Sequence, residues 1–152
     1  HARLSRDMQV RLTGTSRFLA VEAVVLGRTA MGETMEKGML DDRWRIWRDG
    51  RLIYADALHL DGPVDALMRR AAIGAGARAT AVLIHVSTQA SALLGQVREA
   101  LDGALGLAAA SAWNGMLVTR LVAADGAILR HDLDRALTAL RDGRPLPRVW
   151  SC

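Results

Sequence analysis

Three stretches of the chain carry the spacing of apolar and polar residues that is typical of β-strands. Residues 18–26 are apolar except for Glu22, which predicts a buried strand. Residues 78–86 predict a second strand, and residues 8–13 alternate loosely between apolar and polar. Strands are therefore expected in both halves of the chain.

Two turn sequences between apolar segments predict β-hairpins. Asp49-Gly50 separates residues 43–47 from 52–60, and Asn114-Gly115 separates residues 107–113 from 116–123. Both dipeptides suit a two-residue turn with positive φ angles. The first hairpin is expected to have one packed face, formed by Trp44, Ile46, Leu52, Tyr54, Leu58 and Leu60.

Helical spacing follows in three places. Pro63 opens a first segment that ends at residues 74–76, and Ser91 is expected to cap a second. The last helix is predicted over residues 132–141, with Asp132 and Asp134 at its amino end. The apolar sides of the three are, in order, Val64, Leu67, Met68 and Ala71; Leu93, Leu94, Val97 and Leu101; and Leu133, Ala136, Leu137 and Leu140.

These elements predict an α+β protein that is mainly β-sheet, with two or three helices. Its carboxy-terminal part is expected to run strand, helix, strand, strand, helix. No repeat or low-complexity linker divides the chain, so residues 1–152 are predicted to form a single domain. No apolar run approaches the roughly 20 residues of a membrane span and no signal-peptide pattern opens the chain, which predicts a soluble, cytoplasmic protein.

The charge of the chain gives little support to nucleic-acid binding. The net charge is +4, and all of its basic residues except Lys37 are arginines, a bias that GC-rich codons explain more simply than phosphate contacts do. The arginines are scattered except for a group in the first hairpin, Arg43, Arg45, Arg48 and Arg51. An Arg-rich binding module for an acidic partner or nucleic acid is kept as the alternative function.

Catalytic and metal motifs are missing from the sequence. Its single cysteine, Cys152, and its dispersed histidines at positions 1, 59, 85 and 131 form no metal-ligand pattern. Neither a nucleophile elbow nor a phosphate-binding loop occurs, so no enzyme activity is predicted. His85 is expected to be a hydrogen-bonded, partly buried strand residue, His59 to be solvated, and His131 to lie at a helix start.

The segment from Gly27 to Glu33 is the main candidate for function. Two glycines, Gly27 and Gly32, enclose Arg28 and Glu33 directly after the predicted strand at 18–26. One interpretation is a tight turn in which the two charges pair with each other or with neighbours. The other is that Glu33 offers a carboxylate that holds a divalent metal transiently.

This segment resembles the G-R-x-A-x-G-E signature of the UreD (UreH) family of urease accessory proteins. The Arg-rich hairpin, the helical 93–105 region, the Asn114-Gly115 hairpin and the tail Pro147-Arg148-Val149-Trp150 occur in the family's order. The amino-terminal Thr-Thr-Pro and Leu-Glu-Trp-Leu-Pro segments of the family are absent. The chain is therefore expected to be the carboxy-terminal half of a UreD-like protein.

The resemblance implies a non-catalytic urease maturation factor. Such a protein is expected to bind the urease apoprotein and the accessory proteins UreF and UreG, and to assist nickel insertion into urease. Nickel would pass in transit, without a tightly bound cofactor, and neither nucleic acid nor a membrane would be a partner. The resemblance also implies that Glu33 lines a nickel path, with Gly27, Arg28 and Gly32 shaping the turn.

Overall fold

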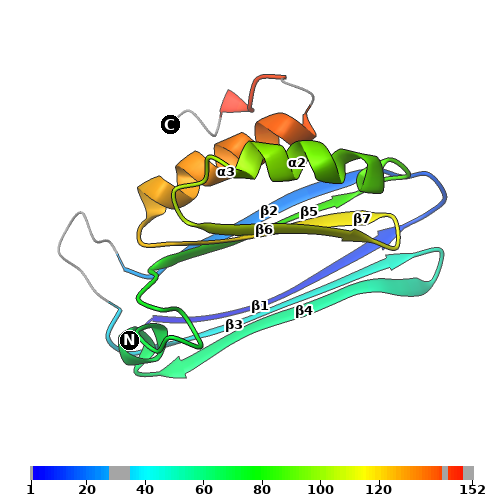
Figure 1. Cartoon of the computed structure of the whole chain (residues 1–152). Helices are drawn as coiled ribbons and strands as arrows, with labels where there is room; N and C mark the ends of the chain where they lie inside the picture. Colours follow the sequence, from blue (N-terminus) through cyan, green and yellow to red (C-terminus); the bar gives the residue numbers. More distant parts are fainter. Residues whose placement is uncertain (1, 28–34, 142–143, 149–152) are drawn as a thin grey trace. The chain divides into compact units, whose positions relative to one another are not determined.

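The computed structural model describes residues 2–27, 35–141 and 144–148. It divides into two compact units (Figure 1): the first comprises His1–Ser16 and Leu26–Gly76, and the second comprises Arg17–Val25 and Ala77–Cys152. The mainly-β α+β class is confirmed. That residues 1–152 form a single domain stays a prediction.

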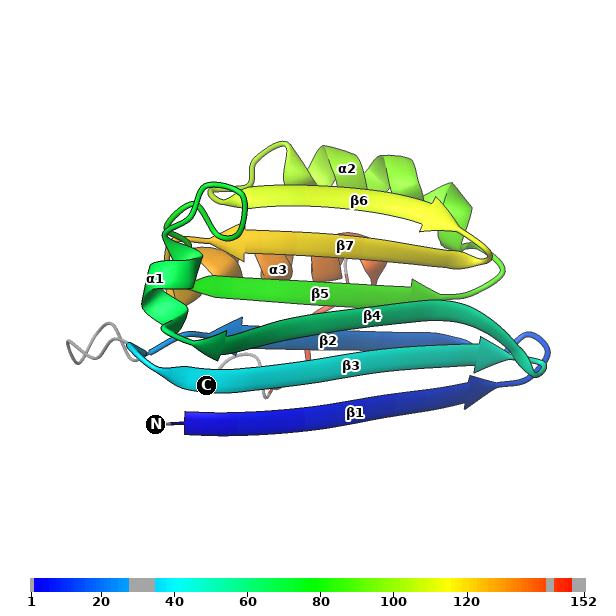
Figure 2. The same cartoon turned by 90° about the horizontal axis from the view of Figure 1, so that it is seen from below.

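The first unit contains one three-stranded sheet. Its strands are β1 (Ala2–Leu12), β3 (Gly38–Arg48) and β4 (Arg51–Gly62), and β3 lies between the other two (Figure 2). β3 and β4 are antiparallel, as in a hairpin, whereas β1 runs parallel to β3. Parallel neighbours need a crossover connection, and here the chain leaves the sheet after β1 to form β2 (Phe18–Val25) in the second unit.

The predicted turn at Asp49-Gly50 is confirmed, with φ angles of 50° and 78°. The predicted packed face is wrong for one residue, Leu52. The register shifts after Ile46, which pairs with Tyr54, so that Trp47 pairs with Leu52 and Ile53 is passed over. An extra residue reverses the side on which the following residues point, and Leu52 is therefore 47% exposed.

The remaining members lie on one face in the observed register, in which Ile46 pairs with Tyr54. The buried apolar side chains of this sheet are Leu40, Trp44, Ile46, Tyr54 and Leu60, of which Ile46 is fully buried. β1 extends the sheet on its other side, where Arg11 lies 5.0 Å from the ring centre of Trp47.

The first predicted helix is shorter than its apolar spacing suggests. α1 spans only Val64–Met68, with Val64 as its buried residue, and Ala71 is exposed beyond its end. Turns continue to Gly76, whose amide donates to the Met68 carbonyl across 2.8 Å. Gly74 permits this tight path, because a Cβ there would lie 2.6 Å from the Met68 carbonyl oxygen.

The second unit contains a four-stranded antiparallel sheet in the order β2-β5-β7-β6. The new strands are β5 (Ala79–Val86), β6 (Leu107–Trp113) and β7 (Met116–Ala123). The predicted strand after residue 78 and the Asn114-Gly115 hairpin are confirmed. The buried strand predicted at 18–26 is wrong in its burial, because β2 lies at a sheet edge and three of its side chains are exposed.

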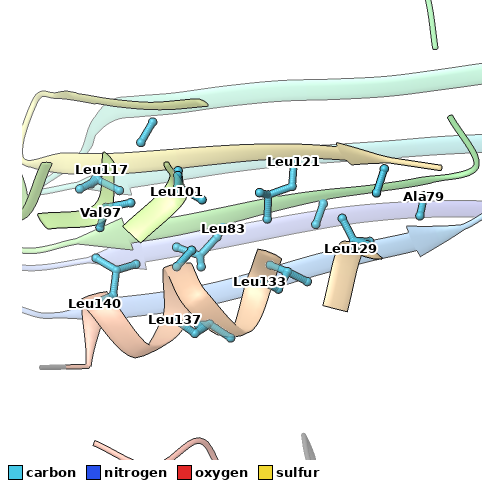
Figure 3. Close-up of a cluster of buried hydrophobic side chains, with 14 of the residues drawn as sticks. Ala79, Leu83, Val97, Leu101, Leu117, Leu121, Leu129, Leu133, Leu137 and Leu140 are labelled. Atoms are coloured by element: carbon cyan, nitrogen blue, oxygen red, sulfur yellow. The ribbon is translucent and has the colours of Figure 1, made fainter. Parts of the chain in front are cut away.

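Two helices cover one face of this sheet (Figure 1): α2 (Leu94–Leu101), preceded by a short 3-10 turn, and α3 (Gly126–Leu140). Their apolar sides meet β5, β6 and β7 in the core of the unit (Figure 3). The largest side chains of this core are Leu83, Val97, Leu101, Leu117, Leu121, Leu129, Leu133, Leu137 and Leu140. The predicted order of strand, helix, strand, strand, helix is thereby confirmed.

Both predicted helix starts in this unit are wrong. Ser91 lies inside the 3-10 turn, which begins after Gln89, and it makes no capping hydrogen bond. α3 begins six residues before Asp132, because Asp125 is its N-cap and accepts a hydrogen bond from the Ile128 amide across 2.8 Å. Asp132 and Asp134 therefore lie inside the helix rather than at its amino end.

Candidate functional site

A glycine with a positive φ angle follows the end of β2. Leu26 is buried, and Gly27 follows it with a φ of 89°, a conformation that side chains other than glycine rarely adopt. Arg28, Gly32 and Glu33 lie outside the described residues, so their predicted roles stay predictions. The described chain resumes at Met35, shortly before β3.

The histidines of the described residues lie apart. His59 is exposed on β4, with Nδ1 3.5 Å from Asp41 Oδ1, and it is solvated as predicted. His131 lies in the middle of α3 and not at a helix start, so that prediction is wrong. No three His, Cys, Asp or Glu side chains gather for a metal in the part of the chain that the structure describes.

His85 is hydrogen-bonded and partly buried, as predicted. Its Nε2 lies 2.9 Å from Ser87 Oγ, and Ser87 is fully buried just beyond the end of β5. Ser87 Oγ also accepts a hydrogen bond from the Gln89 amide across 3.2 Å, so it shapes the turn that leads into α2. Burial and then the charge of Arg17 lower the pKa of His85. Because the Ser87 hydroxyl is fully buried and already holds the turn, the pair supports a structural role over nucleophilic catalysis.

Asp132 is a buried carboxylate with three hydrogen-bond partners, and its role was not predicted from the sequence. It is 1% exposed, and its two oxygens accept hydrogen bonds from the amides of Leu105 and Gly106, each across 2.8 Å. His131 Nδ1 lies 3.0 Å from Oδ1 and must carry a proton to donate to the carboxylate. Burial favours a higher pKa for Asp132, but the hydrogen bonds from His131, Leu105 and Gly106 outweigh it and lower the pKa below 3.8.

A groove of about 570 Å³ lies beside this cluster, between α2 and α3. Two hydrogen bonds join the helices there: Arg135 Nε donates to the Ala100 carbonyl across 2.7 Å, and Gln96 Nε2 donates to the Ala139 carbonyl across 3.1 Å. The groove is lined by Gln96, Glu99, Ala100, His131, Asp134, Arg135, Thr138 and Ala139. Its side chains carry both signs of charge, but most of its lining surface is apolar, a combination that suits contact with a protein partner.

The arginines of the first hairpin are largely engaged inside their own unit. Arg43 Nη2 lies 3.0 Å from Asp41 Oδ2, and Arg45 Nη1 lies 3.4 Å from Asp7 Oδ1. Arg48 Nη2 donates to the Ser16 carbonyl across 2.8 Å. The two carboxylate pairings offset part of the local charge and weaken the alternative of an Arg-rich surface for phosphates.

A comparison with known protein families identifies the family of this chain. The model of the UreD urease accessory protein family matches residues 1–151, which extends through both units. The chain belongs to the UreD family.

Individual UreD proteins agree closely with it. The UreD of Rhizobium leguminosarum bv. viciae is 51% identical over 150 residues, which cover 99% of this chain and 54% of that protein. The UreD of Xanthobacter autotrophicus is 49% identical over 150 residues, covering 99% and 52%. UreD 3 of Methylorubrum extorquens is 50% identical over 151 residues, covering 98% and 50%.

The chain spans about half the length of the curated UreD relatives it matches. Those relatives are named as accessory proteins and not as enzymes. Within the described residues of this UreD family member, no helix has both the length and the apolarity that a membrane crossing demands.

Proposed function

We propose that this chain acts in urease maturation as a non-catalytic scaffold. It binds the urease apoprotein together with UreF and UreG and helps nickel, as cargo, to reach the urease active site. The observation that carries the proposal is the UreD family match over residues 1–151, with relatives that are about half identical.

The geometry of the described residues is consistent with a scaffold. The conspicuous polar groups serve the fold: Ser87 and His85 shape a turn, and Asp132 joins α3 to the chain before β6. A scaffold needs stable surfaces more than a reactive pair, and the groove between α2 and α3, with an apolar floor and charged side chains along it, offers such a surface.

Glu33 is the proposed contact with nickel. Gly27, the first residue of the segment, has a positive φ, which supports the importance of the glycine at that position. A single carboxylate binds a first-row metal weakly compared with clustered thiolates and imidazoles, so it suits release to the next site. Arg28 is proposed to hold the turn by its charge.

Loss of the chain from its native host tests the maturation role. Urease would be purified from cells with and without the gene, and its activity and nickel content measured. The proposal expects apo-urease, with activity lowered at least about tenfold, in the deleted strain, and recovery when the gene is restored. Normal nickel content in the deleted strain would overturn it.

A paired substitution tests Glu33 separately. Glu33→Gln removes one negative charge from the proposed path, while Glu36→Gln removes one from a described, exposed position three residues later. Nickel loading should fall with the first change and persist with the second. Equal loading in both variants would remove Glu33 from the proposal while leaving the maturation role intact.

A further inference from the structure

The helices leave one strand of the four-stranded sheet largely uncovered. In the described part of the second unit, the buried core beneath the helices takes its side chains from β5, β6, β7 and the helical segments, and none from β2. Val21 of β2 is only partly buried against this core. β2 is therefore the open side of the helix-covered face.

The register with β5 shows which side chains of β2 point to the helix side. Directly paired residues of two strands point to the same face of a sheet, and successive residues alternate between the faces. Residues 79, 81 and 83 of β5 belong to the helix-covered core, so their partners on β2 point the same way. These partners and the next residue in the alternation form a wholly apolar row, which we call the β2 stripe: Leu19, Val21, Ala23 and Val25.

Much of the β2 stripe is exposed to water. Leu19 is 37% exposed, Val25 is 50% exposed, and Ala23 is exposed as well. Isolated apolar residues on a surface are ordinary, but four in one row extend for about 20 Å beside the core. A continuous row of this kind suits a covering segment.

The carboxy-terminal tail already reaches the same core. After α3 the chain turns back beside the helices (Figure 1), and Arg141 Nη2 donates a hydrogen bond to the Pro145 carbonyl across 3.0 Å. Leu146 then packs against the core, as Val21 does. Proline at positions 145 and 147 disfavours a continued helix, so the tail runs as a strap.

The arrangement of the two helices leaves the β2 side as the free side of α3. α2 lies against the other side, where two side-chain hydrogen bonds join the helices. Val25 marks the direction of the strap, because a Cβ built on Gly126, at the start of α3, would lie 3.3 Å from Val25 Cγ2. A tail that turns back from the end of α3 therefore runs toward Val25.

The tail has both the length and the side chain for this surface. Trp150 follows Leu146 by four residues, which is up to about 14 Å of extended chain, and Val25 lies about 13 Å from Val21 along β2. An indole brings the large apolar area that a row of short aliphatic side chains lacks.

We infer that the carboxy-terminal tail closes the open side of this unit, with Trp150 packed on the β2 stripe at Ala23 and Val25. Leu146 anchors the strap against the core. Trp150 lies outside the described residues, and its place follows from the anchor, the direction of the tail and the exposed row. This contact belongs to the fold of the second unit and is independent of the proposed role in urease maturation.

Paramagnetic labelling of the natural chain tests the position of the tail. Cys152 is the single cysteine, so a nitroxide can be attached there without any substitution. The amide NMR signals of β2 should broaden most at Ala23 and Val25, while those of β6, at the opposite edge of the sheet, stay sharp. Any other distribution, including broadening centred on β6 or none at all, would overturn the contact and leave the β2 stripe for a further polypeptide.

Two substitutions test the indole itself. Trp150→Ala removes it, and Trp150→Phe is the matched control that keeps an aromatic ring. The backbone amides of β2 that bond to β5 should exchange hydrogen about tenfold faster in Trp150→Ala than in the unchanged chain, and close to the native rate in Trp150→Phe. The amides of β6 that bond to β7 are the internal reference and should exchange at unchanged rates. Equal β2 rates in all three chains, or an equal acceleration in β6, would contradict the strap.

Discussion

Asp132 Oδ2 lies 2.8 Å from the backbone nitrogen of Gly106. The carboxylate stands in the middle of α3, and the amide precedes β6, so one side chain ties the longest helix to the entry of the edge strand. Its other oxygen accepts the Leu105 amide. This buried carboxylate holds the backbone of Leu105 and Gly106, which precedes the first residue of β6 that pairs with β7.

Replacing Asp132 by asparagine should destabilise the second unit. The side chain of asparagine has one acceptor oxygen and one NH2 group. One of the two backbone N–H groups would therefore face the NH2 group and lose its acceptor. Hydrogen bonds to a charged group each contribute about 1.5–3 kcal/mol, and we expect a loss of about 2–3 kcal/mol in the free energy of unfolding. Urea denaturation, at an unchanged slope, measures this loss.

Asp134→Asn is the matched control two residues later. Asp134 is 40% exposed, and Arg130 Nε lies 3.2 Å from its Oδ1. An exposed pair of this kind contributes about 0.5 kcal/mol. Equal losses for the two variants would show that the backbone hydrogen bonds of Asp132 contribute nothing beyond surface charge.

The lowered pKa of Asp132 predicts a loss of stability in acid. Its folded pKa lies below 3.8, so the unfolded chain binds a proton first as pH falls. The stabilisation is complete above the unfolded pKa and disappears as pH falls through the folded pKa. Acid unfolding followed by circular dichroism should therefore be less steep in Asp132→Asn. An identical acid profile for the two proteins would refute this contribution.

Gly106 should not tolerate a side chain. A Cβ there would lie 2.6 Å from the Val122 carbonyl oxygen and 3.1 Å from Asp132 Oδ2, and the carbonyl belongs to the neighbouring strand. Gly106→Ala is expected to cost about 1–3 kcal/mol. Gly95→Ala in α2 meets nothing within 4 Å and should stabilise by about 0.5 kcal/mol. Thermal unfolding of both variants checks these opposite signs, and a stabilising Gly106→Ala would contradict the close approach.

The two hairpins could be predicted because their signals are local. Asp49-Gly50 and Asn114-Gly115 adopt positive φ angles at both residues, so each dipeptide by itself predicts the position of its turn. The stripe of α3 was also visible in the sequence. The predicted start of this helix at Asp132 is wrong because an acidic residue is also favourable at a helix amino end. Leu129, about one turn earlier, already belongs to the same buried stripe.

Long-range placement could not be predicted from the sequence. An apolar strand such as β2 can be central or can lie at an edge, and its neighbour β5 lies far along the chain. The bulge that exposes Leu52 depends on how β4 meets β3, and an alternating pattern does not contain it. Asp132 was missed as a structural residue because its amide partners precede it by more than twenty positions.

His85 gives the last prediction, at mildly acidic pH. Burial and then the positive charge of Arg17 lower its pKa from 6.5, so the folded protein holds this ring neutral where the unfolded chain is already protonated. Stability is complete above the unfolded pKa of about 6.5 and decreases as pH falls toward the folded pKa. Each pKa unit of difference corresponds to about 1.4 kcal/mol. An NMR titration of the ring should give a midpoint below 6.5 in the native protein and a midpoint closer to 6.5 in Arg17→Gln. A native midpoint at or above 6.5 would contradict both the burial and the charge effect.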